Sequence, residues 1–118
     1  MCQKHTGSAF SVSAAFRADG FRITCGAPKF YKSSDITERG FCADCGSTLI
    51  DRYFDPDHPY VWIGVGTLDH PEYVAPTQHW GIESQVPWLT IDDDLPRATT
   101  EDDPDYIAAK AAIDQDGK

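Results

Sequence analysis

Residues 41–47 read Phe41-Cys42-Ala43-Asp44-Cys45-Gly46-Ser47, and this stretch decides how the middle of the chain folds. Two cysteines spaced Cys-x-x-Cys on a tight turn can bind one metal ion together. The glycine that follows permits a positive φ, which turns backbone N–H groups toward the sulfur atoms. Strand-like runs flank the stretch, as in a zinc-ribbon knuckle. The pattern therefore predicts half of a tetrahedral zinc site.

Two other interpretations of Cys42 and Cys45 stay open at this point. The two cysteines of a redox pair normally lie at the start of a helix, whereas here strands are expected on both sides. The two residues could also be unligated core thiols. A structural zinc needs four ligands, and the chain has only two other cysteines, Cys2 and Cys25. Cys25 precedes a glycine in a turn and is expected to be a small, partly buried residue.

Length and composition favour one globular domain. The chain has 118 residues and is 41% hydrophobic, which is enough to bury a core. The net charge of −9 lies mostly in residues 51–118, which hold fifteen acidic and four basic residues. We expect this acidic half to be a solvated face and tail, and we expect no nucleic-acid partner. The sequence shows no signal peptide and no apolar run of membrane-spanning length, so we expect a cytoplasmic protein that does not bind membranes.

Short apolar runs between Gly/Pro turns predict a mostly β fold. The most apolar run, residues 60–65, is expected to be a central strand. The expected strands are Phe10–Phe16, Phe21–Thr24, Phe30–Ser33, Ile36–Phe41, Thr48–Phe54, Tyr60–Val65, Thr77–Gly81 and Pro87–Ile91.

One short helix is expected near the C-terminus. Asp103-Pro104 offers an N-cap followed by proline at the first helical position. The Ala-rich body is Tyr106–Ile113, and Asp114–Lys118 is expected to be a frayed end. A helix of this length needs to pack against something to be stable.

The histidines are candidates for ligands or proton carriers. His58 and His70 lie in Asp/Pro loops and are expected to be solvated. His79 fits a packed residue or a site residue equally well. His5 follows Cys2 by three positions, so the two form a possible ligand pair, although a polar loop histidine is the simpler interpretation. The three tryptophans are expected in the core, with one of the last two able to line a pocket: Trp62, Trp80 and Trp88.

Six motifs in order, within residues 2–96, carry a resemblance to a known family. They are Cys2-Gln3-Lys4-His5-Thr6-Gly7-Ser8-Ala9-Phe10, Phe30-Tyr31-Lys32-Ser33-Ser34, Arg39-Gly40-Phe41-Cys42-Ala43-Asp44-Cys45-Gly46-Ser47, Gly66-Thr67-Leu68-Asp69 followed by Pro71, Pro76 with His79, and Trp88 with Asp93-Asp94-Leu95-Pro96. With these motifs the sequence resembles the glutathione-dependent formaldehyde-activating enzyme (GFA) family, which also includes centromere protein V.

The resemblance implies Mss4-like antiparallel β-sheets with two zinc sites. It implies a GFA-like domain over residues 1–100, followed by an acidic helix and tail over residues 101–118. By the family pattern, Cys42 and Cys45 are ligands of a structural zinc. Cys2 is a ligand of a second, catalytic zinc with an open position for a thiol substrate. Cys25 matches no ligand position.

The chain departs from the family pattern at its start. The family places further cysteines before the position of Cys2, and none precedes it here. Met1 stands where the family segment is variable, and it is the only methionine. We therefore expect Met1 to be an internal methionine of a natural protein that begins some tens of residues earlier, which makes this chain N-terminally truncated.

The resemblance implies a carbon–sulfur lyase-type enzyme, similar to S-(hydroxymethyl)glutathione synthase. It would act on adducts of glutathione, or another small thiol, with formaldehyde or a related electrophile. Cys2 would be the catalytic residue, and Thr6, Gly7, Ser8 and His79 would contact the substrate. This chain alone is expected to have little activity, because most metal ligands are missing. The alternative is a non-catalytic zinc-ribbon module for protein interaction. The sequence does not indicate an oligomeric state.

Overall fold

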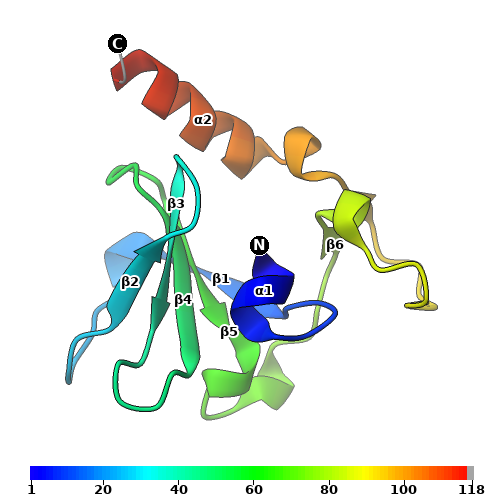
Figure 1. The fold of residues 1–118 in the computed structure, drawn as a ribbon, viewed down its shortest axis with the longest axis horizontal. Coiled ribbons are helices and arrows are strands. Elements are labelled where there is room, and N and C mark those ends of the chain that lie inside the picture. The colour runs from blue at the N-terminus through cyan, green and yellow to red at the C-terminus, as the bar shows by residue number, and fades with distance from the viewer. Residues whose placement is uncertain (117–118) are drawn as a thin grey trace.

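The computed structural model describes residues 1–116 and consists mainly of one antiparallel β-sheet (Figure 1). Five strands lie in the order β1-β5-β4-β3-β2, so the strand formed last in sequence lies between β1 and β4. The strands are β1 (Ser13–Arg17), β2 (Lys29–Lys32), β3 (Thr37–Phe41), β4 (Thr48–Tyr53) and β5 (Tyr60–Gly64). This confirms the expected mostly antiparallel β fold.

The remaining elements surround this sheet. Helix α1 (Cys2–Thr6) lies on one face, and helix α2 (Pro104–Asp116) lies beyond one end of the strands (Figure 1). A separate two-residue parallel pair is formed by β6 (His79–Trp80) and β7 (Arg97–Ala98). Five 3₁₀ turns connect these elements: Ala18–Gly20, Val65–Thr67, Pro71–Tyr73, Ile82–Ser84 and Thr100–Asp102. None of the described helices is both long and apolar enough to cross a membrane.

Several expected strands are corrected by the structure. Phe21–Thr24 and Pro87–Ile91 form no strand, and neither run pairs with a strand of either sheet. The expected strand Thr77–Gly81 shortens to the two residues of β6. Helix α1 was not predicted, since five residues are too few to show a helical period.

Helix α2 confirms the expected C-terminal helix. The side chain of Asp103 accepts a hydrogen bond from the backbone N–H of Tyr106 (2.8 Å), which is the expected N-cap. The helix continues to Asp116, past the expected start of fraying, and residues 117–118 lie outside the described residues. Ala109 is almost fully buried, so the helix packs rather than projecting freely.

The buried core is small. Its apolar members are Ala14, Ile36, Ile50, Val61 and Ala109. The expectation that all three tryptophans lie in the core is wrong for Trp80 and Trp88, which are 43% and 76% exposed. Both belong to the segment after the five-stranded sheet, where the described strand pair β6–β7 is only two residues long and too small to bury them.

His58 also differs from expectation, because it is buried rather than solvated. Its ring packs at the end of β4 and β5 against the rings of Tyr53, Tyr60 and Trp62. On its far side, Nε2 lies 3.5 Å from the carboxylate of Asp105 in α2. Three aromatic neighbours therefore hold this loop residue inside and place it against the C-terminal helix.

Candidate functional site

Helix α1 carries most of the predicted site residues. It ends at Gly7, whose φ of 68° is the left-handed conformation that stops a helix. The Thr6 hydroxyl donates to the carbonyl of Cys2 (2.9 Å) and accepts from the N–H of Ser8 (3.3 Å). The side-chain amide of Gln3 donates to the carbonyl of Ser84 (2.9 Å). Cys2, Thr6, Gly7 and Ser8 are thus held together in one capped turn that is fixed to a distant loop.

Three ionisable side chains meet where α1 contacts the sheet, and we call them the α1 cluster: His5 of α1, Arg39 of β3 and Asp51 of β4. Arg39 and Asp51 are cross-strand partners on β3 and β4, and Arg39 Nη1 lies 3.1 Å from Asp51 Oδ2. His5 Nε2 is 3.9 Å from Asp51 Oδ1. His5 Nε2, Arg39 Nε and Asp51 Oδ1 are buried and have no hydrogen-bond partner among the described residues. The sequence analysis did not identify this cluster, because the pairing of Arg39 with Asp51 becomes visible only in the register of β3 and β4.

Burial sets the protonation of the α1 cluster. It lowers the pKa of His5, although the negative charge of Asp51 acts in the opposite direction. Burial also raises the pKa of Asp51, and the positive charge of Arg39 limits that rise. His5 is therefore mainly a neutral imidazole at neutral pH, and it lies beside a carboxylate whose charged form Arg39 favours.

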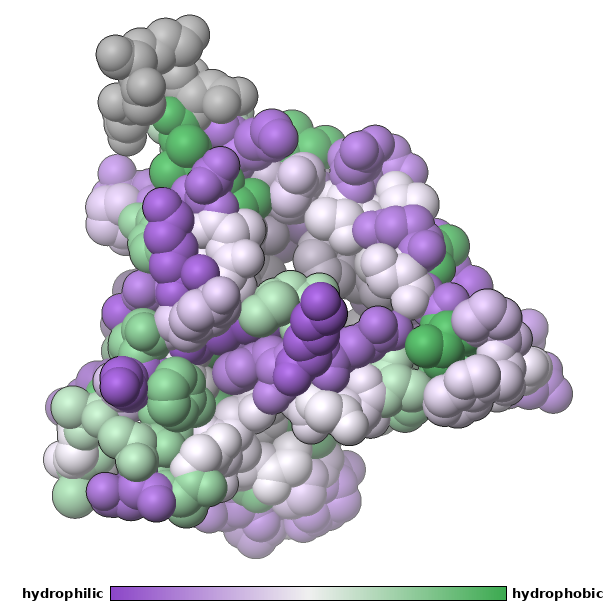
Figure 2. All heavy atoms as spheres, in the orientation of Figure 1, coloured by the Kyte–Doolittle hydropathy of each residue, from purple (hydrophilic) through white to green (hydrophobic). Residues whose placement is uncertain are grey.

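Two grooves open on either side of α1. The first has a volume of about 340 Å³ and is lined by Thr6, Phe10, Val12, Thr48, Asp51 and Thr67 among others. The second, of about 600 Å³, is lined by Lys4, His5, Lys29, Phe30, Phe41 and Gly46 among others. Figure 2 shows hydrophilic residues over α1 in the middle of this face and hydrophobic ones toward the β2 edge of the sheet.

The turn Cys42–Ser47, which connects β3 to β4, is closed by two backbone hydrogen bonds. The N–H of Cys42 donates to the carbonyl of Ser47 (2.9 Å), and the N–H of Gly46 donates to the carbonyl of Cys42 (2.8 Å). Gly46 has a φ of 79°, as the sequence predicted. The two thiols lie near each other. The Ser47 hydroxyl, 3.0 Å from the Cys45 sulfur, lowers the pKa of Cys45, and the Ser47 N–H and the Cys42 thiol add to this.

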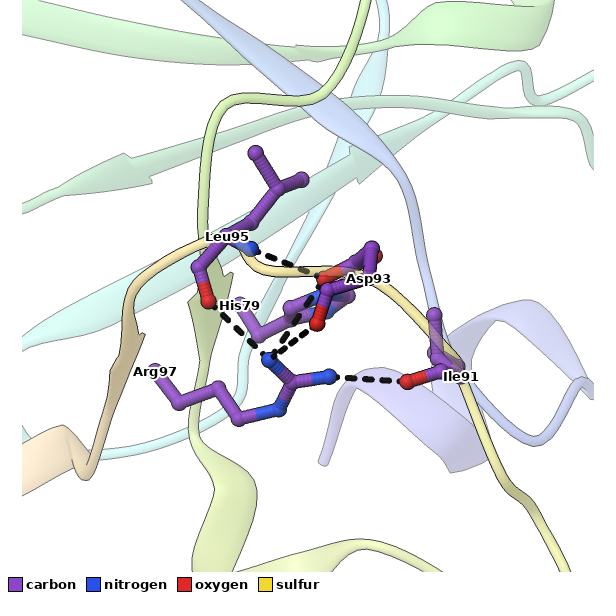
Figure 3. Close-up of polar contacts among 5 residues, drawn as sticks. All are labelled: His79, Ile91, Asp93, Leu95 and Arg97. Carbon is purple, nitrogen blue, oxygen red and sulfur yellow. Dashed lines mark hydrogen bonds and ion pairs between the residues drawn. The ribbon is translucent and has the colours of Figure 1, made fainter.

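His79 lies in a different part of the molecule and is engaged by an aspartate. Its Nε2 is 2.9 and 2.8 Å from the two carboxylate oxygens of Asp93 (Figure 3). Arg97 donates to the backbone carbonyls of Ile91 (2.8 Å) and Leu95 (3.0 Å), which closes the loop around Asp93. The hydrogen bond from His79 lowers the pKa of Asp93. His79 lines neither groove beside α1, so its described contacts hold the 91–97 loop in place.

Comparison with known protein families assigns the chain to one of them. Residues 1–84 match the family described as glutathione-dependent formaldehyde-activating enzyme. The chain belongs to this family. The match includes α1, the five-stranded sheet and the Cys42–Ser47 turn, and it ends before Asp93 and α2. No curated protein matches the chain.

The residues of this GFA-family chain do not by themselves complete a zinc site. Within the described residues, no three His, Cys, Asp or Glu side chains are grouped so that they could hold a metal ion. Cys42 and Cys45 supply two thiolates, whereas a structural zinc takes four ligands. Cys2 on α1 does not join them. Cys25 is exposed rather than partly buried, and it takes no part in such a group.

Proposed function

We propose that this protein acts on adducts of glutathione, or another small thiol, with formaldehyde or a related small electrophile, as a carbon–sulfur lyase-type enzyme. The observation that carries the proposal is the family match over residues 1–84, because it contains α1, the sheet beneath it and the Cys42–Ser47 turn. We also propose that the sheet is of the Mss4-like kind, that residues 1–100 form the GFA-like domain and that the protein is cytoplasmic.

The groove beside Thr6 and Asp51 is the place where we propose that the thiol binds. Its volume of about 340 Å³ lies within the range typical of small-molecule pockets. Thr6, Thr48 and Thr67 offer hydroxyl groups, while Phe10 offers an apolar wall. Thr6, Gly7 and Ser8 remain our candidates for substrate contact. His79 is the weakest candidate, because its ring nitrogen is already bound to Asp93.

The proposed chemistry needs a proton to leave the thiol and another to reach the aldehyde oxygen. The thiolate sulfur forms a bond to the carbonyl carbon, the π electrons move to oxygen, and the oxygen takes the proton; the reverse reaction breaks the C–S bond. His5 is a neutral imidazole whose Nε2 lies 3.9 Å from Asp51, a residue that lines the groove proposed for the thiol, so we propose that it accepts and returns the proton. Cys2 lies one turn away from His5 on α1. We propose that Cys2 is the catalytic residue and that its thiol is a metal ligand. We expect weak activity, since among the described residues Cys2 belongs to no group of three His, Cys, Asp or Glu side chains that could hold a metal ion.

A second candidate function is a non-catalytic module that binds another protein. The observation that favours it is the incomplete metal site, together with the exposed rings of Tyr73 and Trp88. This alternative predicts binding to a protein partner with no dependence on a thiol.

The experiment is a ¹³C NMR exchange measurement with labelled formaldehyde and glutathione. The proposal predicts that the protein accelerates exchange between free and thiol-bound formaldehyde beyond the buffer rate. Cys2→Ser and Thr6→Val should reduce this acceleration, while Cys25→Ser, which changes an exposed thiol outside both grooves, should not. Exchange at the buffer rate, with no shift of protein resonances on adding glutathione, would contradict the proposal and favour the interaction module.

A further inference from the structure

Three buried polar atoms of the α1 cluster have no hydrogen-bond partner among the described residues. They are Nε2 of His5, Nε of Arg39 and Oδ1 of Asp51. Arg39 Nη1 already lies 3.1 Å from the other carboxylate oxygen of Asp51. His5 Nε2 is 3.9 Å from Oδ1, which is too long for a direct hydrogen bond. Buried polar atoms in folded proteins are almost always paired, so these three atoms call for a further partner of small size.

The three unpaired atoms match the hydrogen-bonding capacity of one water molecule. Burial lowers the pKa of His5 more than Asp51 raises it, so the ring is mainly neutral, and with its proton on Nδ1 the Nε2 atom is an acceptor. Asp51 Oδ1 is a second acceptor, and the Nε–H of Arg39 is a donor. A water molecule donates twice and accepts, and it can lie about 2.8 Å from two atoms that are 3.9 Å apart. The positive charge of Arg39 disfavours a cation at the same position.

The α1 cluster also connects the two grooves beside α1. Asp51 lines the first groove, where we propose that the thiol binds, and His5 lines the second. Among the described residues that line the first groove, Asp51 is the only one with an ionisable side chain. A proton that leaves a thiol there therefore meets the carboxylate of Asp51 first, and the 3.9 Å gap separates it from the imidazole of His5.

We infer that Asp51, together with one buried water held by His5 and Arg39, carries the proton between the thiol groove and His5. The S–H bond of the thiol breaks, and its electron pair stays on sulfur. Asp51 accepts the proton and releases it to the water, which passes a proton on to His5 Nε2. Asp51 and the water end as they began, and the reverse transfer supplies the proton that the aldehyde oxygen takes. The relay rests on the proposed function, whereas the water site does not.

Arg39 is a positioning residue in this scheme. It lines neither groove, and it acts by binding Asp51 and by donating to the water. The same two strands carry a matched ion pair one register position away, in which Arg52 Nε lies 2.6 Å from Glu38 Oε1. Glu38 lines neither groove, so this second pair offers a control for changes in the α1 cluster.

The first measurement tests the water site without any activity. NMR of the full chain labelled with ¹⁵N-histidine should show a neutral His5 ring with its proton on Nδ1. It should also show a nuclear Overhauser effect from long-lived water to the ring hydrogens of His5. Arg39→Met, which removes the Nε–H donor, should weaken this effect, and Glu38→Gln should not. A ring proton on Nε2, or no effect from water in the wild type, would overturn the inference.

The second measurement tests the relay in the ¹³C exchange experiment with formaldehyde and glutathione. Asp51→Asn should reduce the acceleration by about 100-fold, or to the buffer rate, because an amide does not carry the proton. The shifts of protein resonances on adding glutathione should remain, which separates proton transfer from binding. Glu38→Gln should leave the exchange rate unchanged.

A second variant keeps the relay testable if Asp51→Asn does not fold by circular dichroism. His5→Phe should lose the same factor, and the double variant should lose no more than either single variant, because both groups lie on one proton path. Full acceleration in either single variant, or losses that multiply in the double variant, would overturn the relay. Exchange at the buffer rate in the wild type would instead contradict the proposed function, and the water signal would still decide the site.

Discussion

Replacing Arg39 by methionine should test whether the α1 cluster supports the site. Methionine keeps most of the apolar stem of Arg39 but removes the charge that lies 3.1 Å from Asp51. The side chains of Arg39 and Asp51 are only 11% and 27% exposed. Removing one partner of a fully buried ion pair costs roughly 3–5 kcal/mol. Because water still reaches Asp51, we expect Arg39→Met to lower the free energy of unfolding by about 2–3 kcal/mol at neutral pH.

The pH dependence of this loss is the sharper part of the prediction. Without Arg39, the pKa of Asp51 rises further, and the pKa of His5 rises because Arg39 no longer repels its charged form. The folded variant then takes up protons more readily than the wild type as pH falls from 7 toward about 5. A folded state that binds more protons gains stability at lower pH, so the difference between variant and wild type should shrink there.

The wild type should lose more stability than the variant over this range. Its His5 has a lowered pKa in the folded state, so the unfolded chain takes up this proton first as pH falls below 6.5. That contribution to stability is present above pH 6.5 and is lost as the pH falls through the pKa of His5 in the folded state. Urea denaturation of both proteins across this range measures the two slopes.

Arg17→Met is the matched control for Arg39→Met. Arg17 lies at the same distance from Asp19, 3.1 Å, but both side chains are more than half exposed. We expect no measurable loss of stability and no change in the pH profile, because water screens such a pair. Equal losses in the two variants, or an Arg39→Met profile parallel to that of the wild type, would refute the reasoning.

Four further substitutions test other parts of the structure. Ile50 is 3% exposed, so Ile50→Ala should lower the free energy of unfolding by about 2–5 kcal/mol in urea denaturation. Gly46→Ala and Gly26→Ala should each lower the free energy of unfolding by roughly 1–2 kcal/mol, because both glycines have a positive φ. Only Gly46→Ala should also weaken the binding of Co²⁺, which is measured by absorbance. Asp93→Asn should flatten the acid side of the thermal stability profile. In the wild type, the lowered pKa of Asp93 contributes to stability above pH 3.8. This contribution is lost as the pH falls through the pKa of Asp93 in the folded state.

Local sequence signals predicted the sheet and the Cys42–Ser47 turn well, because neighbouring residues determine them. The strand-like runs of β3, β4 and β5, the glycine with positive φ and the Asp103 cap all follow from a few adjacent positions. Phe21–Thr24 has the composition of a strand but forms none, since strand formation depends on a distant partner. The pairing of β1 with β5 is equally non-local and could not be derived from composition.

The candidate site was predicted only in part, for the same physical reason. Cys2 and Thr6 were named from motifs, but the helix that presents them is too short to leave a periodic pattern. His5 was considered as a metal ligand beside Cys2, whereas its nearest charged partner is Asp51, forty-six positions away. That contact depends on how α1 docks on β4, and no local pattern encodes docking.

The acidic C-terminal half has a structural role that its charge alone did not indicate. It was expected to be a solvated face and tail, yet two of its aspartates reach histidines within the family match. Asp93 binds His79 at 2.8 Å, and Asp105 lies 3.5 Å from the buried His58. Both aspartates lie beyond residue 84, where the match ends. Residues beyond the matched range therefore hold His58 and His79 in place, and a change in either aspartate should alter the surroundings of a histidine within residues 1–84.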